Sequence, residues 1–478
     1  MNVALRILLL GSALATPGIG SAETLRAALQ KAYLTNPTLT GARAQQRSLD
    51  ETVPINRAQG LPSANASATF TENVEQSSTS FLSPERQLGA QVQLNVPLYA
   101  GGGIRNAVRA AQTRVEAGRA ELRDTEASLF SQVVGAYMDV IRDEAIVGLQ
   151  TANVGVLRVN LEATRDRFQV GDLTRTDVAQ SEARLALARS QLEGAQAQLI
   201  TSREQYVRLV GEPPVALEPP PPLPNLPTAP QTAVTVALEN NPALRSAQRQ
   251  REATRFDVGV ARASRLPQVA AVGTSNYSNF LNTLGSSNPN TSRSSAVGVQ
   301  ATLPLFQGGG PAAQVRRAQA RESQAIEAVT EVERLIVAQT RSAYASWRAS
   351  NENIVSSQAA VDANTLSLEG VRAENSVGTR TILDILNAEQ ELLNSQVNLV
   401  SSRRNAYVAG FTLLAAMGQA EARDLGLEGG ALYDPIVNYE RVKSKIWDFD
   451  DDPKPSPVAT RTVDTPAQTP AVTGPVLP

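Results

Sequence analysis

Apolar residues recur at every seventh position through two long stretches of this chain. In the first stretch Val115, Leu122 and Leu129 follow this spacing, which resumes after a shift of four residues and continues from Val133 to Phe168. The second stretch has the same spacing at Val329, Ile336, Trp347, Ile354, Val361 and Leu368. A sustained seven-residue repeat of apolar positions predicts long helices that pack as coiled coils. The shift of four residues is a stutter that locally unwinds the supercoil.

Each long helix is followed by a shorter one with the same spacing. The apolar positions of the shorter helices are Val178, Leu185, Leu192, Leu199 and Tyr206, and then Ile385, Leu392, Leu399, Ala406 and Leu413. A single helix over residues 104–168 would span ~100 Å, and helices over 23–58 and 173–209 would span ~55 Å each. Two short helices placed end to end would therefore match one long helix.

Between the helical segments, apolar and polar residues alternate as they do in half-exposed strands. Residues 63–71 and 88–98 alternate most clearly, residues 297–305 repeat the pattern, and residues 267–277 follow it more weakly. Strands of ~10 residues with one apolar and one polar face fit a transmembrane β-barrel with a wet interior. An amphipathic hairpin packed on a soluble core would alternate in the same way, so this pattern alone leaves both interpretations open.

The order of these segments occurs twice, because the chain is a tandem duplication. Asn36-Pro37 recurs as Asn241-Pro242, an offset of 205 residues, and Val170-Gly171 recurs as Val377-Gly378, an offset of 207. The first repeat covers residues 23–210, a proline-rich linker covers 211–230, and the second repeat covers 231–418. Since the linker contains nine prolines, it should be an extended strap and not a helix.

Both ends of the chain have their own composition. Residues 1–22 combine a basic start, a short apolar stretch and small residues before the cleavage position, which is typical of a secretory signal peptide. This apolar stretch is too short to span a membrane, and no later run of 18 apolar residues predicts a transmembrane helix. Residues 450–478 are rich in Pro, Thr, Ala and Val, which predicts a disordered tail.

The composition removes most kinds of catalytic chemistry. The 478 residues include no His and no Cys, so disulfides, thiolate nucleophiles, the usual zinc sites and Ser-His dyads are absent. With 44 basic and 46 acidic residues, nothing in the net charge of −2 favours nucleic-acid binding. We find no catalytic constellation, and we expect no enzyme, no cofactor and no metal site.

A membrane protein with this sequence would have to span as a β-barrel. Four strands cannot close a barrel, since about eight are the practical minimum. The protomer should therefore oligomerise, as a dimer with eight strands or a trimer with twelve. Eight strands would fill the interior with side chains, so a conducting duct favours the larger number.

Over residues 23–445 the sequence resembles the TolC family of outer-membrane efflux ducts. The resemblance rests on Leu-Pro before the strands, on Val96-Pro97-Leu98-Tyr99 and Leu303-Pro304-Leu305-Phe306 at the strand ends, and above all on residues 377–387. It implies an α+β membrane protein that assembles as a homotrimer. Antiparallel coiled-coil helices would form an α-barrel through the periplasm, four strands per protomer would form a 12-stranded β-barrel in outer-membrane lipid, and residues 419–449 would form an equatorial segment.

The resemblance also implies partners and a function. A periplasmic adaptor would connect the duct to an inner-membrane ABC or RND pump, and the duct would export proteins or small toxic compounds from a Gram-negative cell. The stretch 434–439 resembles the branch that serves type I secretion, and a duct used only for RND-type multidrug efflux is the alternative. The rival of another class is a secreted coiled-coil structural protein or adhesin that conducts nothing.

Candidate functional residues lie at two kinds of turn. Gly171 and Gly378 end the long helices and suit left-handed C-caps, while Thr174-x-x-Asp177 and Thr381-x-x-Asp384 have the form of capping boxes. Helix capping is therefore one sufficient reason for both aspartates. The strand-to-helix turns contain Gly101, Gly102 and Gly103, and then Gly308, Gly309 and Gly310.

The resemblance assigns a second role to the turns that end the long helices. It implies that they lie at the closed periplasmic tip, that Asp384 lines a ring of carboxylates, and that Arg380 and Asp177, with Thr176, make the contacts that hold neighbouring coils closed. Two positions depart from the family pattern, because Asn387 replaces a second carboxylate and Asn375 replaces a tyrosine. A weaker ring and a looser lock are the expected result.

Overall fold

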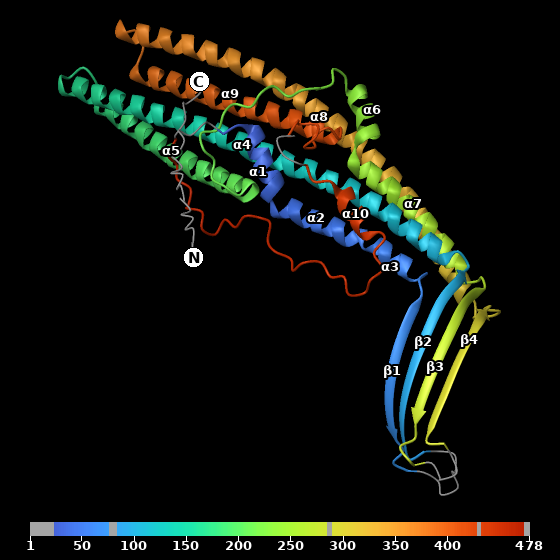
Figure 1. The fold of residues 1–478 in the computed structure, drawn as a ribbon. Helices are drawn as coiled ribbons and strands as arrows, with labels where there is room; N and C mark the ends of the chain where they lie inside the picture. Colours follow the sequence, from blue (N-terminus) through green and yellow to red (C-terminus); the bar gives the residue numbers. More distant parts are fainter. Residues whose placement is uncertain (1–22, 76–83, 284–288, 428–431, 473–478) are drawn as a thin grey trace, which may run out of the picture.

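A computed structural model describes residues 23–75, 84–283, 289–427 and 432–472. Long helices form a rod-like body, and a four-stranded sheet extends from one end of it (Figure 1). The predicted signal peptide lies outside the described residues. None of the described helices has a stretch that is long and apolar enough to cross a membrane.

The N-terminal segment of each repeat is divided into shorter helices, whereas we expected a continuous helix over 23–58 in the first repeat. The helices are α1 Leu25–Thr35, α2 Pro37–Asp50 and α3 Thr52–Ala58 in the first repeat, and α6 Pro230–Asn240 and α7 Pro242–Ala263 in the second. The side chain of Asn36 accepts a hydrogen bond from the Thr38 amide (2.9 Å), and Asn241 does the same for Ala243 (2.9 Å). An asparagine N-cap followed by proline starts a new helix, which explains the breaks at Asn36 and Asn241 but not the one between α2 and α3, where Glu51 makes no side-chain cap.

Four helices form the two long hairpins. They are α4 Gly103–Gln169 with α5 Arg175–Val210, and α8 Gly310–Ser376 with α9 Ile382–Ala416. Many of the residues with heptad spacing are buried, among them Val115, Val133, Val140, Leu199 and Ile336. The main apolar core lies where α1, α4 and α5 meet, around the fully buried Phe130, Tyr137 and Tyr206.

The sheet is antiparallel in the order β1-β2-β3-β4. Its strands are β1 Ser63–Glu72, β2 Arg86–Ala100, β3 Gln268–Asn279 and β4 Thr291–Thr302. The register places Ala66, Val92, Ser275 and Ser295 in one row of the apolar face, and Asn65, Gln93, Thr274 and Ala296 in the next row on the polar face. Ser275 and Ser295 hydrogen-bond to each other (3.0 Å), so these two hydroxyls partner one another on the apolar face.

One irregularity changes the predicted alternation of the second strand. Pro97 pairs with Ala270 but Tyr99 pairs with Val269, so Leu98 is the extra residue of a β-bulge. A bulge shifts the following residues to the opposite face. Tyr99 therefore joins the apolar face, although simple alternation had placed it on the polar face.

Glycines make both strand-to-helix turns. Gly101 and Gly102 have φ values of 60° and 77°, and Gly308 and Gly309 have 58° and 81°, which only glycine adopts at little cost. A Cβ on Gly101 would also lie 2.8 Å from the Leu266 Cβ. Gly103 and Gly310 are the first residues of α4 and α8, so the triplets are turns, as predicted.

The linker and the tail run along the helical body without forming long elements. Residues 211–229 contain no helix and pair with the N-terminus through a bridge between Glu23 and Leu217. After the short helix α10, Pro435–Val442, the described part of the tail also has no helix or strand. It is nevertheless anchored, because the buried Arg203 on α5 donates to the Ala471 carbonyl (2.9 Å).

Candidate gate at the helical tips

The two hairpin turns lie at the end of the helical body that is remote from the sheet (Figure 1). At the first turn the Gly171 amide donates to the Phe168 carbonyl (3.0 Å), and at the second the Gly378 amide donates to the Asn375 carbonyl (3.0 Å). Both glycines are left-handed, with φ values of 84° and 82°. The turns therefore end the long helices with the C-cap geometry predicted from the sequence.

Both predicted capping boxes are formed, with nearly identical geometry. Asp177 Oδ2 accepts hydrogen bonds from the Thr174 amide (2.8 Å) and hydroxyl (2.7 Å). Asp384 Oδ2 accepts the equivalent bonds from Thr381 (2.9 and 2.8 Å). The side-chain bond from Thr174, then its backbone bond, lowers the pKa of Asp177, and the backbone bond from Thr381 is the larger cause of the lowered pKa of Asp384. The tips thus display carboxylates that are stabilised in the ionised form.

Arg380 makes its ion pair inside its own turn. Its Nε lies 2.7 Å from Glu374 Oε2, and this pairing raises the pKa of the Arg380 guanidinium. The Asn375 side-chain amide donates to the Arg380 carbonyl (2.7 Å), so this asparagine braces the turn. Within the described part of one chain Arg380 does not pair with Asp177, and Thr176 is exposed. A contact between neighbouring chains stays a prediction.

Below the turns, polar contacts join the two hairpins, and the sequence analysis did not anticipate them. Arg184 on α5 donates to the Asn387 side chain on α9 (2.7 Å). Glu389 on α9 is buried, where it accepts from Asn160 on α4 (3.0 Å) and pairs with Arg372 on α8 (3.0 Å). Asn387 therefore connects the two repeats within one chain, and its effect on a carboxylate ring stays a prediction.

A sequence signal for Glu389 existed but was missed. It lies between Leu386 and Leu393 at the 3-4 spacing of a buried stripe, and all three are buried. A carboxylate in an apolar stripe requires a partner, since an unpaired buried charge is costly. The identity of its partners could not be deduced, because Asn160 is far away in the sequence.

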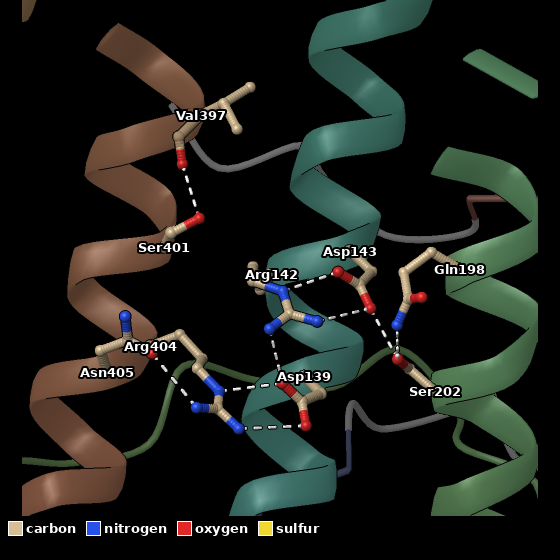
Figure 2. Close-up of polar contacts among 9 residues, drawn as sticks. All are labelled: Asp139, Arg142, Asp143, Gln198, Ser202, Val397, Ser401, Arg404 and Asn405. Carbon is tan, nitrogen blue, oxygen red and sulfur yellow. Dashed lines mark hydrogen bonds and ion pairs between the residues drawn. The ribbon is translucent and has the colours of Figure 1, made fainter. Parts of the chain in front are cut away.

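A second polar connection lies further along the same helices (Figure 2). Asp139 on α4 accepts two hydrogen bonds from Arg404 on α9 (2.9 and 3.1 Å) and lies 2.8 Å from Arg142. Arg142 also pairs with the buried Asp143 (2.7 Å), which accepts from the Ser202 hydroxyl on α5 (2.6 Å). This network fixes α9 and α5 to α4, so the two hairpins are fastened below the tip as well as at it.

The described residues include no group of acidic side chains that could hold a metal ion within one chain. Each turn carries one capping aspartate, Asp177 or Asp384, beside an ion pair of its own, Arg167 with Asp172 or Arg380 with Glu374. Fold and tips together define a protein made of two helical hairpins that carry a shared four-stranded sheet.

Comparison with known proteins identifies the family. The family model described as "Outer membrane efflux protein" matches residues 28–212 and again residues 233–419, once in each repeat. The chain belongs to this outer membrane efflux protein family. It is therefore an outer-membrane protein that extends into the periplasm and serves as an exit duct, not an enzyme.

Individual relatives agree with this assignment. The chain is 33% identical to outer membrane efflux protein BepC of Brucella suis, over 93% of this chain and 95% of that one. It is 25% identical to outer membrane protein TolC of Escherichia coli over 93% of each chain. The fold is similar to the CmeC outer membrane channel of Campylobacter jejuni, with a TM-score of 0.73 and 16% identity over 93% of this chain and 97% of that chain.

Proposed function

We propose that three copies of this chain form one continuous duct through the outer membrane and the periplasm. The asymmetry of burial between the two repeats carries this proposal. Helices α4 and α8 have 67 residues each, yet 21 residues of α4 are buried and only six residues of α8. The large apolar side chains Ile326, Leu335, Val355 and Leu366 of α8 stay exposed in the single chain. A neighbouring copy packed against α8 would cover them.

The sheet supports the same assembly. Among the described residues its outer strands β1 and β4 each leave one edge unpaired, and both strands are exposed along their whole length. Open edges are a liability that closure into a barrel removes. Three four-stranded sheets would supply twelve strands, with the polar face toward a wet interior and the apolar face toward lipid.

The gate belongs to the same assembly. Since the tips of both hairpins lie at one end of the body, three copies would bring three Asp384 carboxylates around one axis. We infer that this ring attracts cations. We also infer that Arg380 pairs with Asp177 of a neighbouring coil, either in place of Glu374 or in addition to it, and that this contact holds the tip closed.

Export would need partners on the inner side. We propose a periplasmic adaptor and an inner-membrane pump of the ABC or RND type. A relative named alkaline protease secretion protein AprF, from Pseudomonas aeruginosa, is 28% identical over 64% of each chain. That name favours type I protein secretion, whereas a duct confined to multidrug efflux is the second candidate.

Reconstitution tests the duct directly. Detergent-extracted protein should migrate as a trimer that dissociates on heating, and it should conduct ions in planar bilayers. In a strain that lacks its own outer-membrane duct, the gene should restore export. Restored export of a secreted protein would support type I secretion, and restored export of a toxic compound alone would support multidrug efflux. A soluble, non-conducting coiled-coil species would instead support the structural or adhesin alternative.

A further inference from the structure

The charged residues of the sheet have an uneven distribution. The four strands contain three of them, Glu72, Arg86 and Arg293, and all three lie near the end remote from the helices. By register, Arg293 is in the row of Tyr277 and Ala90, and Glu72 is opposite Arg86 in the row beyond Phe70 and Leu88. These rows belong to the apolar face, so the charges do not face the polar side of the sheet.

The depth of Arg293 follows from strand geometry. From Arg293 to Ala301 on the same face, eight residues rise about 27 Å along the strand. At the usual tilt of such strands this corresponds to roughly 20 Å across the membrane, close to the ~25 Å apolar band of outer-membrane barrels. Tyr277 marks one end of this band and Tyr99, turned to this face by the bulge, marks the other. Tyrosines at both ends are typical of the two membrane interfaces.

The two arginines differ in their partners. Arg86 is neutralised by Glu72, with its Nη2 3.0 Å from Oε1. Arg293 is exposed, its guanidinium carbon lies 5.4 Å from the centre of the Tyr277 ring, and it makes no ion pair among the described residues. The Tyr277 ring orients the guanidinium but does not neutralise its positive charge, so the N–H groups stay available to an anion.

We propose that Arg293, supported by Tyr277, binds the phosphate of an anionic lipid headgroup in the outer leaflet. This inference rests on the proposed orientation, in which the apolar face contacts lipid and the far end of the sheet points outward. A guanidinium binds phosphate through two parallel hydrogen bonds, and a phosphate at the rim of the apolar band lies at the depth of the headgroups. A soluble anion would have no reason to prefer this face.

The test compares lipid binding by purified trimers. Wild-type protein and variants are titrated with phosphatidylglycerol and, separately, with phosphatidylcholine, and bound lipids are counted by native mass spectrometry. Arg293→Gln should weaken phosphatidylglycerol binding about fivefold, since one basic residue near an anionic headgroup is worth about that factor. It should weaken phosphatidylcholine binding less, because the choline ammonium offsets the charge of that phosphate. Arg293→Lys should retain most of the preference.

Arg86→Gln is the matched control, because it removes an arginine of the same face whose charge is already neutralised. It should change phosphatidylglycerol binding less than Arg293→Gln does. Equal binding by wild type and Arg293→Gln would overturn the proposal, and so would displacement of the lipid by millimolar inorganic phosphate. Trimer formation and conductance of the wild type are measured in the same preparations, so a failure of the proposed duct would be seen separately.

Discussion

The polar face of the sheet and the helical tips line opposite ends of the proposed duct, and they differ in charge. The polar face carries hydroxyls and amides, with no charged residue among its strand positions. The tips carry Asp177 and Asp384, whose pKa values are lowered by capping hydrogen bonds. A neutral polar face at the sheet and ionised aspartates at the tips would place ion selectivity at the tips, where the aspartates of three copies would converge.

The largest expected effect is on the stability of the sheet, when an arginine is placed on one face or the other of strand β2. Val92→Arg puts an arginine on the apolar face, where it costs ~2–4 kcal/mol near the middle of the bilayer. Gln93→Arg puts the same residue on the polar face and should leave the trimer intact while shifting selectivity toward anions. Urea unfolding in vesicles and reversal potentials measure the two effects. Equal destabilisation by both variants would contradict the assignment of the faces.

Opening of the tip is the next effect in size. Arg380→Ser should raise single-channel conductance severalfold if Arg380 holds neighbouring coils together. Its pair with Glu374 is exposed, and exposed ion pairs add little to stability, so the helices should stay folded. Glu374→Gln is the control, because it breaks the same pair within the chain but keeps the arginine. If both variants conduct alike, Arg380 acts only within its own turn.

Measurements of ion selectivity should distinguish the roles of the two capping aspartates, Asp384 and Asp177. Asp384→Asn should reduce cation selectivity and block by trivalent cations, since it removes the ring charge but keeps the side-chain shape. Asp177→Asn alters an almost identical capping box, so any loss of capping is matched between the two variants. Equal effects on block by the two variants would leave Asp384 as a cap alone.

The pH dependence of selectivity gives the smallest but most specific signal. The bonds from Thr381 lower the pKa of Asp384 in the single chain, so its charge should be lost only as pH falls below the ordinary value of 3.8. Three converging carboxylates would repel one another and raise that pKa. A titration midpoint above 3.8 therefore indicates a ring, because a separated cap titrates below that ordinary value. Reversal potentials measured between pH 3 and 7 would distinguish them.

Much of the fold was readable because its signals are local or periodic. The heptads predicted the hairpin helices, the alternation predicted the strands, and the glycine and Thr-x-x-Asp patterns predicted the turns and caps. The break at Asn36 was also available as a cap-and-proline signal, although we expected one continuous helix there. Family comparison, with one match in each repeat, agrees with the duplication seen in the sequence.

The sequence by itself determined where helices, strands and turns lie, because these depend on neighbours within a few residues. Only the tertiary structure decided which distant polar groups meet. Asp139 and Arg404 belong to different repeats, the partners of Glu389 come from two other helices, and the bulge at Leu98 alone sets the face of Tyr99. Such contacts require helices to be placed side by side and strands to be paired in register, and no local pattern encodes either.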